Sequence, residues 1–351
     1  VYKRQCLSES YFPINARREE NNMKKIGLLA LSALMVTSLA GCGSAKDNAK
    51  KELKEVTLVL DYVPNTNHTG FYVAQEKGYF KEEGLKVNII EPGDDSTSAV
   101  LVAANKGEFG VSYQEDVTYA RTAEEVLPIK AIATIIQHNT SGFVSLKKEN
   151  IKSPKDFEGK VYAGWQAPSE EAVIKAVMNK ANADFKKLTM VGADGSGFAA
   201  LGKKVDIQWE FEGWAVIKGR MDGYDVNYMP LKDLDKRLDY YTPVIITNEK
   251  MLKEDPETVQ KFMNAVKKGY EYAIDHPEES AEIMKKILPD TDFAFLKESQ
   301  KYLSAEYRKD AKTWGVVKDE VWDNYTDFMY EYKLIDKKIK ASEQYTNEFV
   351  K

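Results

Sequence analysis

The stretch VTLVLDYVPNTNHTG, residues 56–70, joins an apolar strand pattern to a polar loop. Its first five residues are aliphatic or β-branched, which predicts a strand over 56–60. The loop leads into a helical pattern, and Asn67 or Thr69 is expected to cap that helix. Ligands of open α/β sheets bind at the carboxyl ends of strands, so this loop is a candidate binding segment. Its candidate ligand contacts are Asp61, Tyr62, Asn65 and His68.

Strand and helix patterns alternate through the rest of the chain. Further strands are predicted at 86–90, 109–113, 129–136, 143–146, 160–163, 188–191, 205–209, 225–228 and 241–247. Helices are predicted at 68–83, 169–181, 256–275, 277–287, 292–303 and 318–332, with a capped helix start at 95–97. The alternation predicts an α/β protein with two lobes, each on a mixed, mostly parallel sheet, and a helical C-terminal tail.

The two lobes are expected to exchange chain at two places. Lobe 1 is predicted to comprise 55–138 and 248–351, and lobe 2 to comprise 143–245. The crossovers are expected near 137–142 and 241–247. A cleft between the lobes is the expected place for a ligand.

The segment before the first strand has the pattern of an export signal. A basic start at Met23 precedes an uncharged apolar stretch, 26–39, that is too short to cross a bilayer as a stable helix. The small residues before Cys42, with the cysteine itself, resemble a bacterial lipoprotein signal over 23–41 in which Cys42 is lipidated. An uncleaved N-terminal anchor is the alternative, and either interpretation exports the remainder of the chain.

Two short segments flank this signal. Residues 1–22 are polar and charged, which is wrong for a signal start, so we interpret them as a non-native leader outside the fold. Residues 42–54 are small, polar and lysine-rich, which is typical of a flexible tether between a lipid and a domain.

Composition excludes several classes of function. The net charge of −5 argues against non-specific binding of nucleic acid. Cys6 and Cys42 both precede the first strand, so the body of the protein has no disulfide, thiol nucleophile or thiolate metal site. The three histidines lie far apart in sequence and no metal motif is present, so we expect no metal and no cofactor.

Three further strand exits carry polar and aromatic side chains. Tyr113, Gln114 and Glu115 follow the strand predicted at 109–113. In the second lobe, the candidate ligand contacts at strand exits are Trp165, Glu170, Trp209, Glu210 and Trp214. A single tryptophan is most simply explained by core packing, but three at strand exits near carboxylates favour a binding surface.

The charge type of these segments indicates the kind of ligand. They hold carboxylates and aromatic rings and lack lysine and arginine, whereas an anion site needs cationic groups or clustered backbone donors. We therefore expect a flat ring with N–H donors, such as an aminopyrimidine, or an amine cation. A sulfonate or nitrate receptor is the alternative, for which Arg121 is the nearby cation.

Taken together, residues 61–70, Lys77–Phe80, Ser112–Asp116, Gly164–Met178 and Val205–Trp214 resemble the substrate-binding lipoproteins of thiamine-precursor importers. The resemblance implies a periplasmic-binding-protein-like fold and no enzymatic activity. It implies capture of a formylaminopyrimidine or hydroxymethylpyrimidine for an ABC permease and its ATPase, by a monomer held through Cys42 on the outer face of the cell membrane. Within the predicted site, Trp165, Trp209 or Trp214 would stack on the ring and Asp61, Glu170 or Glu210 would accept from its amine.

The same superfamily contains a thiamine pyrimidine synthase, which consumes its own histidine and pyridoxal phosphate with iron. That enzyme carries a lysine about where Ser112 stands, a histidine about where Asp116 stands, and a cysteine cluster in the second lobe. This chain has none of these. Without the lysine no imine to pyridoxal phosphate is expected, so the sequence favours a binding protein over the enzyme.

Overall fold

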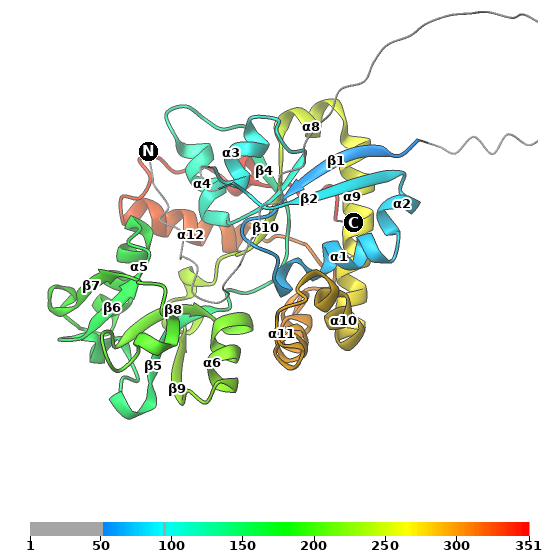
Figure 1. The fold of residues 1–351 in the computed structure, drawn as a ribbon. Helices are drawn as coiled ribbons and strands as arrows, with labels where there is room; N and C mark the ends of the chain where they lie inside the picture. Colours follow the sequence, from blue (N-terminus) through cyan, green and yellow to red (C-terminus); the bar gives the residue numbers. More distant parts are fainter. Residues whose placement is uncertain (1–51, 94–95, 351) are drawn as a thin grey trace, which may run out of the picture.

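Two five-stranded sheets organise the computed structural model, which describes residues 52–93 and 96–350 (Figure 1). The first sheet has the order β2-β1-β3-β10-β4 and the second the order β7-β6-β8-β5-β9. The strands of the first sheet are β1 (Lys54–Val59), β2 (Leu85–Ile90), β3 (Phe109–Ser112), β4 (Ile129–Thr134) and β10 (Val244–Asn248). Those of the second are β5 (Ser141–Leu146), β6 (Val161–Gly164), β7 (Thr189–Gly192), β8 (Ile207–Phe211) and β9 (Val226–Pro230).

Both sheets are mixed in the same way, which confirms the predicted fold class. In the first sheet β10 runs antiparallel to β3 and β4, while β1 pairs in parallel with β2 and β3. In the second sheet β5 is the antiparallel strand, and β6 pairs in parallel with β7 and β8. Each antiparallel strand directly follows a crossover between the sheets.

Helices cover the sheets and dominate the C-terminal part. The α-helices are α1 (Thr69–Glu76), α2 (Tyr79–Glu82), α3 (Ser98–Ala103), α4 (Gln114–Thr122), α5 (Pro168–Lys180), α6 (Ile217–Met221), α7 (Leu231–Leu234), α8 (Glu249–Glu254), α9 (Pro256–Asp275), α10 (Pro277–Ile287), α11 (Phe293–Glu306), α12 (Asp319–Glu331) and α13 (Ala341–Gln344). The short helices are η1 (Thr66–His68), η2 (Lys147–Glu149), η3 (Pro154–Phe157), η4 (Phe185–Lys187), η5 (Gly197–Ala200), the π-helix η6 (Glu212–Val216) and η7 (Lys236–Leu238).

Local sequence signals predicted the bounds of some helices correctly and those of others incorrectly. The helices α9 and α10 begin at prolines and have the bounds that the sequence predicts, because proline fits the first helical turn. The predicted helix over 68–83 is divided instead at Gly78, whose φ of 79° is left-handed and ends α1 before α2 begins. Asn65, rather than Asn67 or Thr69, caps the first turn.

The second crossover lies earlier than the sequence predicts. The first crossover covers 135–140, but the second covers 231–243 and ends where β10 begins. Because β10 pairs with β3 and β4, its first two residues, 244 and 245, belong to the first sheet and not to lobe 2. The expected strand was placed correctly along the chain, and only non-local pairing assigns it to a sheet.

The C-terminal tail is shared by both lobes. In α12, Trp322 packs in a core cluster with residues of the first sheet, such as Val244. Tyr325, Phe328 and Met329 of the same helix join the core of the second lobe. The buried face of α12, a helix that the sequence assigned to lobe 1, thus packs against the cores of both lobes.

The predicted leader, signal, lipidation site at Cys42 and most of the tether lie outside the described residues. Among residues 52–93 and 96–350, no helix has both the length and the apolar character needed to cross a membrane.

Candidate functional site

The register of the crossover strands places the carboxyl edges of the two sheets next to each other. Ser141, at the start of β5, pairs with Phe211 at the end of β8. Val244, at the start of β10, pairs with Ser112 at the end of β3. Both crossovers therefore run between the carboxyl edges of the parallel strands. The loops after β1, β3, β6 and β8 emerge at these edges, where the sequence places the candidate ligand contacts.

Asp61 is the centre of a hydrogen-bonded group on the first lobe. His68 Nε2 lies 2.7 Å from Asp61 Oδ1, and the Tyr113 hydroxyl donates to Asp61 Oδ2 at 2.8 Å. The backbone N–H of Asn65 donates to His68 Nδ1 at 3.2 Å, so that nitrogen carries no proton and Nε2 is the donor to Asp61. Two predicted site residues, His68 and Tyr113, thus converge on the carboxylate of a third, Asp61.

The environment keeps this carboxylate ionised. Burial alone would raise the pKa of Asp61, but the hydrogen bonds from His68 and Tyr113 outweigh it and hold the pKa below its ordinary value. The side chain keeps 9% of its surface exposed, and each carboxylate oxygen has a second lone pair. The group is therefore a fixed anionic acceptor at the carboxyl edge of β1.

Two other loop residues have different surroundings. Asn65 accepts from the backbone N–H of Asn67 at 2.9 Å and donates to the Val63 carbonyl at 3.0 Å, so its side chain stabilises the turn. Tyr62 is 51% exposed and presents its ring to solvent at the same loop.

Gln114 and Glu115 are engaged with the C-terminal part of the chain. The fully buried Gln114 donates to the Trp322 carbonyl at 3.1 Å and accepts from the Tyr241 backbone N–H at 2.9 Å. Glu115 accepts from the Tyr325 hydroxyl at 3.0 Å. These bonds tie α4 to the second crossover and to α12, which gives both residues a structural role that the sequence did not indicate.

Trp165 and Trp209 form a pair with unequal exposure. Their ring centroids are 5.0 Å apart, yet Trp165 is 40% exposed and Trp209 only 8%. The ring centroids of Phe143 and Trp209 are 5.7 Å apart, and the buried indole N–H of Trp209 has no hydrogen-bond partner among the described residues. Trp209 is thus a core residue that supports Trp165, and Trp165 offers the free aromatic surface.

Glu170 holds the loop that carries Trp165. Its buried carboxylate accepts from the Tyr162 hydroxyl and from the backbone N–H groups of Trp165 at 3.2 Å and Gln166 at 2.7 Å. Burial raises the pKa of Glu170, and these hydrogen bonds oppose the rise without cancelling it. Gln166 has a left-handed φ of 61°, a costly conformation for a non-glycine residue that this carboxylate stabilises.

Glu210 differs from the other acidic candidates because no hydrogen-bond donor or positive charge among the described residues stabilises its ionised form. Among the described residues, no donor forms a hydrogen bond with its carboxyl group, and burial raises its pKa to about 7. It follows the buried Trp209 at the carboxyl edge of β8. Such a group can exchange a proton with a ligand near neutral pH.

Trp214 lies in the π-helix η6, directly after β8. Its ring is 4.7 Å from that of Phe295 on α11, in an edge-to-face arrangement. Trp214 is therefore half-buried against α11, a helix of the C-terminal part. Single-turn π-helices are common at functional sites.

Arg121 lies away from these residues. It pairs with Glu249 at 2.9 Å, near the end of α4 and just after β10, which is the amino edge of the parallel strands. An anion receptor that uses Arg121 at the carboxyl edges is therefore not supported. Among the described residues, no group of three or more histidine, aspartate or glutamate side chains is placed to hold a metal ion.

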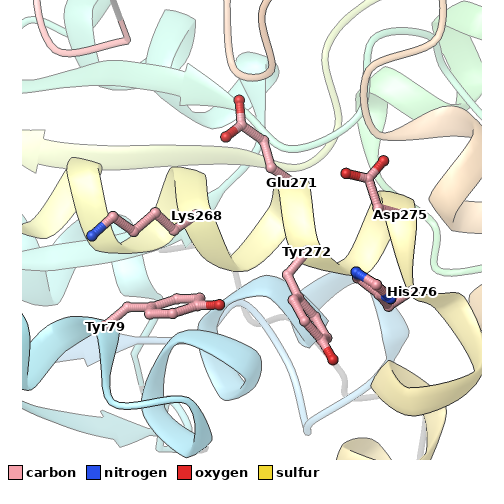
Figure 2. A pocket seen from close by; sticks show the side chains of 6 residues that line it. All are labelled: Tyr79, Lys268, Glu271, Tyr272, Asp275 and His276. Carbon is pink, nitrogen blue, oxygen red and sulfur yellow. The ribbon is translucent and has the colours of Figure 1, made fainter.

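Two surface hollows lie elsewhere. The larger, of about 350 Å³, is formed by Tyr79 from α2 and by residues of α9 and its end, as Figure 2 shows. The smaller, of about 130 Å³, lies in the second lobe beside β6 and β7. None of the predicted ligand contacts lines either hollow, so neither coincides with the candidate site.

Comparison with known proteins defines the family. The family model described as NMT1/THI5 like matches residues 65–280, and the chain belongs to this family. This confirms the predicted resemblance. The formylaminopyrimidine-binding protein of Halalkalibacterium halodurans is 25% identical over 345 residues, covering 93% of this chain and 99% of that protein.

Two further matches describe the range of related proteins. The 4-amino-5-hydroxymethyl-2-methylpyrimidine phosphate synthase of Legionella pneumophila is 24% identical over 305 residues, covering 84% of this chain and 92% of the enzyme. The periplasmic aliphatic sulphonate binding protein of Escherichia coli aligns with a TM-score of 0.65 at 13% identity, covering 83% of this chain and 91% of that chain. The latter likeness shows the fold.

Proposed function

We propose that this protein is the extracytoplasmic solute-binding protein of an ABC importer and captures an aminopyrimidine precursor of thiamine. It passes the ligand to a permease driven by an ATPase, and acts as a monomer held at the outer face of the membrane by lipid on Cys42. The match to a formylaminopyrimidine-binding protein over nearly its whole length supports the ligand class. The lipoprotein pattern before Cys42 supports the location.

The observation that carries the proposal is the fixed carboxylate of Asp61. His68 and Tyr113 orient it and keep it ionised, and its remaining lone pairs can accept N–H bonds. The exocyclic amine of an aminopyrimidine is such a donor. A hydrogen bond to a charged group contributes about 1.5–3 kcal/mol, more than a neutral one.

The second lobe would supply a ring surface and a proton-exchanging group. In this proposal Trp165 stacks on the pyrimidine, since its ring is exposed and is supported by Trp209. Glu210 faces the heterocyclic nitrogens, and Trp214 closes the side next to α11. Rotation about the two crossovers then brings Trp165 onto a ligand held by Asp61.

The synthase relative makes an enzyme the competing candidate. In this chain the position at the end of β3 is the buried Ser112, whose hydroxyl donates to Asp116 at 3.0 Å. A serine cannot form an imine with an aldehyde cofactor, and both cysteines of the chain precede the first strand. The residues present therefore favour binding over synthesis.

Isothermal titration of residues 43–351 with a formylaminopyrimidine tests the proposal. We expect saturable binding with one ligand per chain and no binding of an alkanesulfonate. A second arm adds pyridoxal phosphate and iron, and we expect no imine absorbance and no pyrimidine product. Sulfonate binding in place of pyrimidine binding, or turnover in the second arm, would reject it.

A further inference from the structure

The hydroxyl of Ser299, in α11, joins the loops that carry the candidate site in the two lobes. It donates to the backbone carbonyl of Gly213 in η6 and lies 2.6 Å from the hydroxyl of Thr66 in η1. A serine hydroxyl has one proton, so the bond to Gly213 makes Ser299 the acceptor from Thr66. Ser299 is fully buried, and Thr66 is 1% exposed.

The η6 side of this junction depends on close packing. A methyl group at Gly213 would lie 2.9 Å from the Leu303 side chain, which would have to shift, so the glycine lets η6 approach α11 closely. The Tyr302 hydroxyl donates to Glu212 at 3.0 Å, and Phe295 packs against Trp214. The turn directly after Glu210 is therefore seated on α11.

The loop that contains η1 is also held by a residue directly after α11 and by a residue of α9. The carbonyl of Thr66 accepts from the Tyr307 hydroxyl, and the carbonyl of Asn67 accepts from the Tyr270 hydroxyl at 2.7 Å. Both residues directly precede His68, the donor to Asp61. A displacement of Thr66 would therefore be passed to the His68–Asp61 bond.

We propose that Ser299 is a positioning residue for the ligand site, which sets the loop of His68 and the turn of Trp214 at a fixed spacing without touching the ligand. The proposal rests on the proposed function and deepens it, because it names the buried group through which the two halves of that site are aligned. Ligand affinity then depends on a hydroxyl beneath the site.

A matched variant on the same helix makes this testable. Ser304 is also buried, donates to a backbone carbonyl, that of Ala273, at 2.6 Å, and accepts from Gln300 at 3.0 Å. Its own bonds reach α9 and α11, and its link to a candidate loop is indirect, because Gln300 also accepts from Thr69 at 2.6 Å. Ser299→Ala and Ser304→Ala should lower the melting temperature similarly, since each orphans one buried carbonyl.

Titration with a formylaminopyrimidine should separate the two variants. We expect Ser299→Ala to weaken binding at least about tenfold, equivalent to ~1.4 kcal/mol, and Ser304→Ala to bind as the unchanged protein does. Equal losses in both variants, or none in Ser299→Ala, would overturn the proposal. Should Ser299→Ala not fold, Tyr302→Phe removes another bond between α11 and η6, and it should weaken binding without orphaning a buried carbonyl.

Amide hydrogen exchange without ligand provides a readout independent of the ligand's identity. Ser299→Ala should speed exchange in both 65–70 and 212–216, and Ser304→Ala in neither. If the unchanged protein binds no pyrimidine but this exchange pattern is found, the proposed function fails and the alignment by Ser299 stands. Faster exchange in 212–216 alone would reject the alignment.

Discussion

His138 and Asp239 connect the two crossovers directly, with the imidazole Nδ1 2.6 Å from the carboxylate. The backbone N–H of Asn139 donates to the same carboxylate at 2.9 Å. On its other side His138 Nε2 lies 3.2 Å from Asp310, which itself faces Lys318. The segments about which the lobes would rotate are thus joined by a titratable pair.

Substitution of His138 should change how stability depends on pH. The hydrogen bond to Asp239 raises the pKa of His138 above its ordinary value of 6.5. The pair therefore stabilises the fold fully below pH 6.5, and the contribution is lost as pH rises through the folded pKa. His138→Gln should cost about 0.5–1 kcal/mol at pH 5.5–6 and less at pH 9, measured by urea unfolding. An equal loss at both values would contradict this.

Substitution of Asp61 tests the acceptor at the centre of the site. Asp61→Asn keeps the shape but removes the charge, so ligand affinity should fall by about 1.5–3 kcal/mol, measured by calorimetry. Asp116→Asn is the control, because Asp116 is a carboxylate near the same edge that accepts from Ser112. Unchanged affinity in Asp61→Asn, or an equal loss in Asp116→Asn, would contradict the assigned role.

The two paired tryptophans should respond differently to truncation. Trp165→Ala removes an exposed ring, so affinity should fall by about 2 kcal/mol, the scale of an aromatic hot spot, with little change in stability. Trp209→Ala removes a buried ring and should cost about 3–5 kcal/mol of unfolding free energy as well as affinity. Calorimetry combined with thermal melts distinguishes them. Retention of full affinity by Trp165→Ala would remove it from the site.

Ionisation of Glu210 should lower the free energy of unfolding as pH rises. Burial raises its pKa to about 7, so between about pH 4.5 and 7 the folded state holds a proton that the unfolded state has lost. The unfolding free energy falls over that interval. Glu210→Gln should therefore be more stable than the unchanged protein at pH 8, by about 1–2 kcal/mol, and nearly equal at pH 4.5. Parallel stability curves for the two proteins would show that Glu210 is not desolvated.

Local patterns predicted most of the fold. Periodicity and residue type predicted β1 and the proline-initiated helices α9 and α10. They also predicted the polar loops that follow β1 and β8. They also predicted that Asp61, His68 and Tyr113 would lie at one sheet edge, although the bonds between them required the structure.

The partners of buried polar side chains were not predictable in the same way. Gln114 was expected to face a ligand, but it bonds with Trp322 and Tyr241, more than a hundred residues away. Glu170 holds its own loop, and Trp209 lies in the core. Ser299 gave no signal at all, because a single serine in an amphipathic helix is unremarkable until its neighbours are known.

The sequence by itself determined two mixed α/β lobes, an exported chain pattern and an acidic, aromatic set of strand exits, because each depends on residues close together in the chain. Only the tertiary structure decided which carboxylate is fixed and ionised, which tryptophan is exposed, that β10 joins the first sheet and that α12 packs against both lobes. Those properties depend on burial and on hydrogen bonds between distant segments, which local spacing does not encode.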